Sequence, residues 1–333
     1  MKKLDRRTFL GAGSALTAAS LFQIVPRHVL GGTAYAAPSE KLNIAGIGVG
    51  GMGASNLGAL QSENIVALCD VDTDYAANTF KQYPNAVVYK DYRIMLEKQQ
   101  DIDAVVIATP DHTHAVIAMA AMRAGKHVYC QKPLTHTVHE ARRLAQAAEE
   151  TGVCTQMGIQ GHSGKDARQV CEWIAAGAIG AVREVITWCS LTYYPWGHAS
   201  WSSSRGTRPE ETPPVPETLD WDLWLGPAPH RPYHSCYHPR TWRSWLDFGC
   251  GMMGDRGAHT LDPVVWALNL GAPETVEANS TDLNDETHPI ASIVRYQFPA
   301  RNGLPPVTVS WYDGLEPPRH PDVENPRDLG DGE

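Results

Sequence analysis

Short apolar runs alternate with amphipathic stretches through the first half of the chain, starting at Leu42. The apolar runs are typical of β-strands, and they read LNIAGI, IVALCD, AVVY, AVVIAT, HVYC and CTQMG. The stretches between them predict helices, notably from Gly51, Tyr75, His112 and His136. Continuous apolar strands separated by helices predict an α/β fold, a doubly wound parallel sheet with helices on both faces.

The pattern changes beyond Gly152. A helix from Asp166 to Ala176 and a strand from Val182 to Ser190 are expected, and Met252 to Leu270 is typical of an amphipathic helix. Three strand-like runs follow, TVEANS, ASIVRYQFP and PVTVSWYD. They predict a C-terminal α+β domain with an open, mainly antiparallel sheet, covered by helices on one face and available for a homo-oligomer on the other.

The N-terminus has the pattern of an export signal. Basic residues come first, a weakly polar stretch follows, and small residues at Ala34 to Ala36 suit cleavage before Ala37. The run RRTFL resembles a twin-arginine signal, which predicts a periplasmic protein. The expected division is a signal peptide at 1–36, the doubly wound α/β domain at 37–158 and the α+β domain at 159–333. An uncleaved membrane anchor is the alternative, and no stable membrane span is expected after cleavage.

Composition and charge narrow the class of protein. Of 333 residues 43% are hydrophobic and 20% charged, which excludes a disordered polymer. The formal net charge is −9, and because residues 1–36 contribute +4, the rest of the chain carries −13. A protein this acidic repels the phosphate backbone of nucleic acids, so nucleic acid is not an expected partner.

A glycine motif directly follows the first strand. Gly48, Gly50 and Gly53 form a G-x-G-x-x-G between a strand and a helix, with Gly51 and Met52 inside it. Asp70 ends the second strand 22 residues after Gly48, close to the spacing of a carboxylate that binds the ribose hydroxyls of a dinucleotide. That carboxylate would repel a 2′-phosphate, so the pattern predicts a Rossmann-type domain that binds NAD in preference to NADP.

Two polar segments follow the fourth and fifth strands, at the sheet edge where ligands of such folds bind. Their candidate cofactor-binding residues are Thr109, Pro110, His112, His114, Gln131 and Lys132. Asp111, His112 and His114 have the side chains of metal ligands, but no matching third cluster occurs, so no metal is expected. Asp111 or Thr113 is expected to cap the helix that begins there.

The segment from Leu191 to Gly251 is dense in Pro, Trp, Tyr and His and holds six of the ten tryptophans. So long a segment without regular pattern is usually functional or part of an interface. Aromatic faces can pack on sugar rings, which predicts a carbohydrate pocket, although core or subunit contacts are the alternative for single rings. The candidate substrate-binding residues are His162, Tyr194, Tyr237, His238 and Arg243.

The ordered motifs IGVGGMG, CDVD, ATPDHTH, QKP and GDRGAHTLD together resemble the Gfo/Idh/MocA oxidoreductases, mostly sugar and cyclitol dehydrogenases. QMG-x-QGHS and WDLWLGPAP are similar to the exported branch of that family. The resemblance implies that Lys132 lies beside the nicotinamide and stabilises a developing alkoxide. It also implies that His259 is the general base and that Asp255, on the same helix face, is the partner of His259. Gln131 stands where the family commonly has Glu. Relatives normally continue through further strands, so the chain is expected to be incomplete at its C-terminus.

Three functions fit these residues. The first is an NAD-dependent oxidoreductase acting on a secondary alcohol carbon of a sugar, cyclitol or glycoside. The second is a redox-neutral, glycosidase-like enzyme in which the same hydride returns; glycosidase members of the superfamily commonly lack the lysine that Lys132 matches, which favours the first. The third is a sugar-binding protein without catalysis.

Overall fold

A computed structural model describes residues 40–189 and 207–318. The expected signal peptide and Tyr194 lie outside these residues. Residues 40–42 and 62–64 form a small unit of their own, in which the Leu42 N–H donates to the Glu63 carboxylate at 2.8 Å. Apart from Asn64, the two sheets and their helices belong to a second unit.

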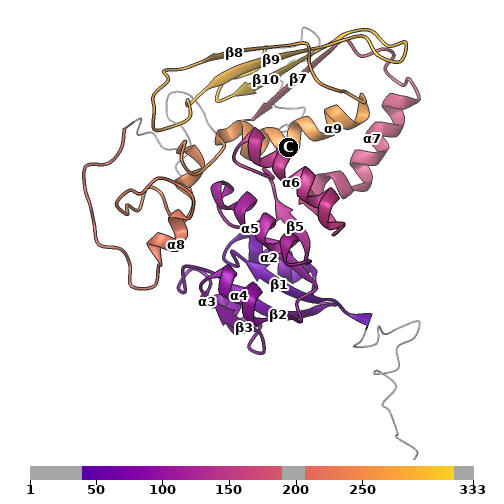
Figure 1. The fold of residues 1–333 in the computed structure, drawn as a ribbon. Coiled ribbons are helices and arrows are strands. Elements are labelled where there is room, and N and C mark those ends of the chain that lie inside the picture. Colours follow the sequence, from indigo (N-terminus) through magenta and orange to yellow (C-terminus); the bar gives the residue numbers. More distant parts are fainter. Residues whose placement is uncertain (1–39, 190–206, 319–333) are drawn as a thin grey trace, which may run out of the picture. The chain divides into compact units, whose positions relative to one another are not determined.

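The first sheet consists of six parallel strands in the order β3-β2-β1-β4-β5-β6, as the apolar runs predict (Figure 1). The strands are β1 Asn43–Ile47, β2 Asn64–Cys69, β3 Val87–Tyr89, β4 Ala104–Ile107, β5 His127–Gln131 and β6 Thr155–Gly158. Because the order reverses beside β1, the carboxyl ends of β1 and β4 flank the crevice in which ligands of such sheets bind.

Helices cover both faces of this sheet, which makes it doubly wound. They are α2 Met52–Ala59, α3 Ala77–Gln82, α4 Tyr92–Lys98, α5 Asp111–Arg123 and α6 Val138–Thr151. Alternate residues of a strand enter opposite cores. Ala45 and Ile47 pack with side chains of α4, α5 and α6, while Ile44 packs with side chains of α2 and α3. This burial on both faces explains why the strands are continuously apolar.

The helix starts differ in detail from the prediction. Helix α6 begins at Val138, where Thr137 and Glu140 form a reciprocal capping box. Helix α5 begins at Asp111 after Pro110, so the prediction that Asp111 or Thr113 is its N-cap was wrong. The Asp111 carboxylate instead accepts a hydrogen bond from the Cys250 N–H at 3.0 Å.

The second sheet has the order β7-β10-β9-β8 (Figure 1). Its strands are β7 Glu184–Cys189, β8 Thr275–Ser280, β9 Ser292–Phe298 and β10 Val307–Asp313. The pairs β10–β9 and β8–β9 are antiparallel, whereas β10 and β7 are parallel, so the sheet is mixed. The predicted fold class, a Rossmann-type sheet with a C-terminal α+β domain, is confirmed.

Two helices accompany this sheet, α7 Lys165–Ala175 and α9 Ala258–Ala267. The 3-10 turn Gln160–Ser163 precedes α7. The single helix expected from Met252 to Leu270 is divided: Met253–Gly257 is a π-helical turn, and only α9 is α-helical. Glycines at both 254 and 257 weaken the α-helical preference of this stretch.

Residues 207–251, which we call the aromatic segment, contain little regular structure. The helix α8 Trp221–Leu225 and the 3-10 turn Thr241–Ser244 are its main elements. Its core consists of large rings and aliphatic side chains: Leu219, Trp221, Trp224, Leu225, Tyr237, Trp242, Trp245 and Phe248.

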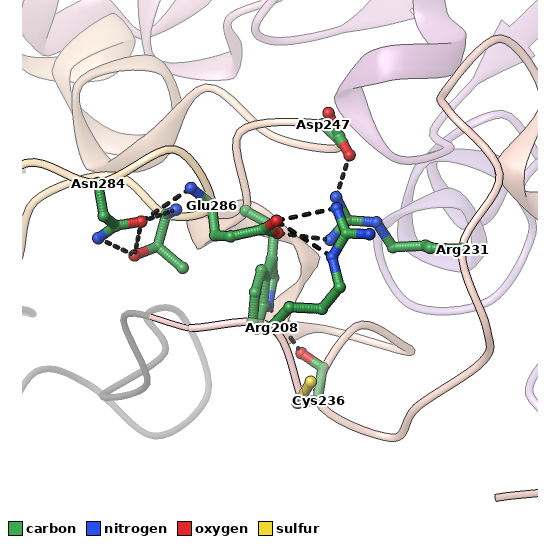
Figure 2. Close-up of polar contacts among 8 residues, drawn as sticks. Arg208, Arg231, Cys236, Asp247, Asn284 and Glu286 are labelled. Carbon is green, nitrogen blue, oxygen red and sulfur yellow. Dashed lines mark hydrogen bonds and ion pairs between the residues drawn. The ribbon is translucent and has the colours of Figure 1, made fainter. Parts of the chain in front are cut away.

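Arg231 lies against this core with its side chain only 3% exposed. Its guanidinium pairs with Asp247 and Glu286, and the half-exposed Arg208 also pairs with Glu286 (Figure 2). The same guanidinium lies over the rings of Tyr237 and Phe248, at 5.3 and 5.0 Å from their centroids. A buried cation with two acidic partners thus joins the aromatic segment to the loop before β9.

Candidate active site

The glycine turn after β1 has the geometry that its sequence predicts. Gly48 has a positive φ of 77°, which few other residues adopt. A Cβ at Gly53 would lie 1.9 Å from the Gly48 carbonyl oxygen, so only glycine permits the close contact between helix α2 and the turn. Helix α2 has no side-chain N-cap, so the positive end of its dipole can attract an anionic ligand.

Asp70 lies beside this turn at the end of β2. Its carboxylate accepts hydrogen bonds from the N–H groups of Val49 at 2.8 Å, Gly50 at 3.1 Å and Asp72 at 3.0 Å. Burial raises the pKa of Asp70, and these three N–H groups oppose that shift. The carboxylate is therefore fixed next to the glycines, where a ribose would be recognised.

A cavity of about 790 Å³ starts at the glycine turn and Asp70. It continues past Thr109 and Pro110 to Lys132 and His259. Its volume lies within the usual range of cofactor and ligand sites. At the sheet edge the buried Nε2 of Gln131 has no hydrogen-bond partner among the described residues, so a donor is available to a ligand there. The donors, the glycine turn and the volume fit a dinucleotide.

Lys132 and Asp255 form a buried pair at the other end of the cavity. The Lys132 Nζ donates to Asp255 Oδ1 at 2.5 Å and to the Asp255 backbone oxygen at 2.8 Å. The Arg243 Nε donates to the same Oδ1 at 3.3 Å. Burial pushes the pKa of Asp255 upward, but the charges of Lys132 and Arg243 outweigh it and hold the pKa below its ordinary value. Asp255 is therefore an anion between two cations.

His259 lines the same cavity from the first turn of α9. It follows Asp255 by four residues across the π-helical turn, and both residues line the cavity. Such π-helical turns occur frequently at functional sites. The structure thus brings together the three residues predicted to be catalytic, although Lys132 and Asp255 are 123 residues apart in sequence.

Two family profiles match consecutive parts of the chain. The profile described as "Oxidoreductase family, NAD-binding Rossmann fold" matches residues 42–159, and the one described as "Oxidoreductase family, C-terminal alpha/beta domain" matches residues 163–302. The chain belongs to the Gfo/Idh/MocA oxidoreductase family. Its first half is accordingly an NAD-binding Rossmann domain, as the glycine turn and Asp70 predict.

Curated relatives in the family include two kinds of enzyme. The chain is 33% identical over 148 residues to inositol 2-dehydrogenase of Rubrobacter xylanophilus, covering 43% of this chain and 42% of the relative. It is 29% identical over 205 residues to "Glycosyl hydrolase family 109 protein 1" of Shewanella sp. (strain ANA-3), covering 54% of this chain and 44% of the relative. In both cases the match spans less than half of the relative's length.

Solved structures share the fold. The WlbA dehydrogenase of Chromobacterium violaceum, solved with NADH and UDP-GlcNAcA, aligns with a TM-score of 0.60 at 18% identity, over 84% of this chain and 69% of that one. GenD2 from gentamicin A biosynthesis, solved with NAD, aligns with a TM-score of 0.59 at 21% identity, over 89% of this chain and 70% of that one.

Some Gfo/Idh/MocA motif residues support the site without lining the cavity. The His112 ring nitrogens lie 3.2 and 3.1 Å from the backbone oxygens of Phe248 and Trp224, and burial lowers its pKa to about 4, so the neutral ring donates to one of the two. The His114 ring nitrogens lie 2.7 and 2.8 Å from the backbone oxygens of Pro133 and Thr109. Both histidines therefore join the Rossmann sheet edge to neighbouring segments. Among residues 40–189 and 207–318, no group of three or more His, Cys, Asp or Glu side chains is placed to hold a metal.

The candidate substrate residues are distributed over several places. Arg243 lines the cavity at Asp255, and His238 lines it at the opposite end, where its Nε2 lies 2.8 Å from Asp72 Oδ2. Tyr237 is 1% exposed and packs within the aromatic core. His162 pairs with Asp262 at 2.9 Å and stacks on Trp266, away from the residues that line the cavity.

The cavity also has walls that the motifs did not indicate. They include Tyr75, Arg240 and Trp242, and two motif residues for which no role was predicted, Trp224 in WDLWLGPAP and Arg256 in GDRGAHTLD. Tyr75 follows CDVD and Trp224 lies within WDLWLGPAP, but nothing in the local pattern of either residue separates a lining ring from a core ring. No helix in the described part of the chain is both long and apolar enough to cross a membrane.

Proposed function

We propose that the protein is an NAD-dependent oxidoreductase that acts on a secondary alcohol carbon of a sugar, cyclitol or glycoside. The observation that carries this proposal is the single cavity that joins the glycine turn and Asp70 to Lys132, Asp255 and His259. The similarity to inositol 2-dehydrogenase supports a polyhydroxylated substrate.

When bound, NAD⁺ supplies the acceptor for a hydride. The chain's own residues manage the proton and the developing charge. In the proposed reaction the His259 imidazole removes the hydroxyl proton, and the Lys132 ammonium donates a hydrogen bond to the oxygen as it becomes negative. Asp255 keeps Lys132 in place through the 2.5 Å contact.

Asp255 has a second role in this proposal. Its Oδ2 is buried and has no hydrogen-bond partner among the described residues, while Oδ1 faces both Lys132 and Arg243. Leaving a carboxylate oxygen buried without a donor is unfavourable. A substrate hydroxyl that donated to Oδ2 would remove this penalty and orient the sugar.

The test compares two histidine variants on a panel of cyclitols, sugars and glycosides with added NAD, measured by NADH absorbance. His259→Ala should lower turnover by about 10²- to 10⁴-fold, the usual contribution of a positioned general base, while NAD affinity measured by titration stays unchanged. His162→Ala is the matched control, because His162 does not line the cavity, and should retain turnover. Wild-type turnover in His259→Ala would refute the assignment of the base.

A redox-neutral reaction on glycosides is the second candidate, and the similarity to the Shewanella glycosyl hydrolase family 109 protein favours it. In that reaction the hydride returns to the substrate and a glycosidic group leaves. Aryl glycosides distinguish the two functions, since aglycone release without net NADH supports the second and net NADH supports the first. The presence of Lys132 favours the first.

We also propose export by the twin-arginine route to the periplasm, which the RRTFL run supports. Replacing both Arg6 and Arg7 by Lys should leave the protein in the cytoplasmic fraction of a producing cell. The wild-type chain should then be found in the periplasmic fraction or, if the signal is not cleaved, at the membrane.

Assembly through the C-terminal sheet is a further proposal. Strand β8 is exposed along its whole length, with Val276 56% exposed, so part of the sheet is available to another subunit. Sedimentation of wild type and Val276→Asp should show a homo-oligomer that the charge dissociates.

A further inference from the structure

The side of the glycine turn that a dinucleotide must approach is occupied by Tyr75. A Cβ placed on Gly50 would lie 2.2 Å from Tyr75 Cδ1 and 2.4 Å from its Cε1. A Cβ on Gly51 would lie 2.8 Å from the Tyr75 hydroxyl oxygen. The ring therefore packs directly on the backbone of these two glycines. In a G-x-G-x-x-G turn the second glycine leaves this space empty so that a pyrophosphate can reach the backbone.

The Tyr75 ring is held in this position from two directions. The Asp72 Oδ1 accepts hydrogen bonds from the N–H groups of Asp74 at 3.0 Å and Tyr75 at 3.2 Å, which fixes the turn that carries the ring. The Asp72 Oδ2 contacts His238 Nε2 at 2.8 Å. The His238 ring in turn meets the Tyr75 ring edge to face, with centroids 6.0 Å apart.

The aromatic segment supplies this second support over a long sequence distance. His238 is 166 residues from Asp72, its side chain is 11% exposed, and it also meets Trp224 edge to face at 5.8 Å. Backbone bonds reinforce the contact: Thr73 N–H donates to Thr218 O at 3.0 Å, and Asp220 N–H donates to Val71 O at 2.9 Å. The residues after β2 are thus clamped by the aromatic segment.

We propose that Tyr75 is a residue that controls cofactor exchange: its ring, held by His238, competes with the dinucleotide pyrophosphate for the face of the glycine turn. Tyr75 is 37% exposed, so its ring has a path into solvent when a cofactor arrives. Only molecules with the ring displaced can bind, and the apparent affinity is reduced by the fraction of such molecules. This inference rests on NAD binding and not on the proposed reaction.

Competition of this kind has a specific kinetic signature. Truncating the ring raises the fraction of binding-competent molecules, so the association rate constant rises and the dissociation constant falls by the same factor. The dissociation rate constant stays unchanged, because the displaced ring contributes nothing to the bound state. A ring that instead contacted the bound cofactor would change the dissociation rate.

The experiment is stopped-flow binding of NADH to the full chain, followed by energy transfer from tryptophan, with thermal unfolding as a check of folding. Tyr75→Ala should bind about tenfold faster and tighter than wild type at an unchanged dissociation rate. Tyr75→Phe is the matched control, since it keeps the ring on Gly50 and should behave like wild type. His238→Ala should shift the association rate in the same direction by a smaller factor.

A faster dissociation from Tyr75→Ala, or an association rate equal to that of wild type, would overturn the proposal while leaving the cofactor assignment intact. No binding of NADH to either protein would overturn both. Because the readout is binding without substrate, loss of the proposed dehydrogenase activity alone would not affect this test.

Discussion

The Rossmann half and the aromatic segment both contribute walls to the cavity, but different interactions order them. In the Rossmann half, parallel strands and their crossover helices satisfy the backbone, and alternate side chains of each strand enter two cores. In the aromatic segment, a helix of five residues and a 3-10 turn are the main regular elements, and packed rings with the Arg231 ion pairs stabilise the rest. Backbone geometry therefore places the glycine turn and Asp70, whereas side-chain packing places the aromatic walls of the cavity.

The prediction with the largest expected effect on stability tests whether side chains stabilise the aromatic segment. Arg231→Ala would leave Asp247 and Glu286 without their buried cation, and we expect a loss of about 3–5 kcal/mol in the free energy of unfolding. Urea unfolding followed by tryptophan fluorescence measures it. Arg208→Ala, which removes a half-exposed partner of Glu286, should change stability by less than about 1 kcal/mol. Equal losses of unfolding free energy in the two variants would contradict the role of the buried Arg231 ion pairs in stabilising this segment.

The second prediction concerns the contact between the two regions at Asp111. Burial, followed by the charge of Asp255, raises the pKa of Asp111 to about 7, and the Cys250 N–H opposes this shift. Between about pH 4 and 7 the folded chain therefore keeps a proton that the unfolded chain releases, so this group's contribution to stability falls as pH rises. Asp111→Asn removes the titration and keeps an acceptor for Cys250.

The unfolding free energy of wild type minus that of Asp111→Asn should therefore decrease by a few kcal/mol between pH 4 and 8, as measured by urea unfolding at each pH. Burial lowers the pKa of His112 to about 4, which makes stability rise with pH, but this contribution is common to both proteins and cancels in the difference. A difference that is constant with pH would show that Asp111 is ionised throughout.

A third prediction concerns the backbone contact in the Rossmann half. Gly53→Ala places a Cβ against the Gly48 carbonyl oxygen, so the turn must shift and NAD affinity should fall by about tenfold, equivalent to about 1.4 kcal/mol. Gly58→Ala in the same helix has no atom within 4 Å of the new Cβ and should stabilise the helix by up to about 1 kcal/mol without changing affinity. Fluorescence titration with NADH compares the two, and equal affinities would refute the role of the turn.

The prediction with the smallest expected effect on stability concerns local helix capping, which should act independently of the aromatic segment. Thr137→Ala removes one half of the capping box of α6 and should lower the free energy of unfolding by about 1 kcal/mol. Thr137→Ser keeps the hydroxyl and should stay close to wild type. Thermal unfolding of the two variants gives the comparison, and a loss in Thr137→Ser as large as that in Thr137→Ala would show that the methyl group matters more than the cap.

The sequence predicted the fold class and several of the residues that line the cavity. Alternating apolar runs indicated the first sheet, and the spacing from Gly48 to Asp70 indicated its ligand. Lys132, Asp255 and His259 were selected by resemblance, and the structure places all three in one cavity. The position of Tyr237 was not predictable in the same way, because a buried core ring and a lining ring have the same local pattern.

Short-range rules encode the strands, the glycine turn and the capping box, since each depends on conformational preferences and hydrogen bonds within a few residues or on a regular period. Which distant side chains meet depends on how the folded segments pack. Tertiary contacts alone join Lys132 to Asp255, place His238 on Asp72, and separate His162 from the cavity. Such contacts leave no periodic pattern in the sequence. They depend on the complementary shape and charge of segments that lie more than a hundred residues apart.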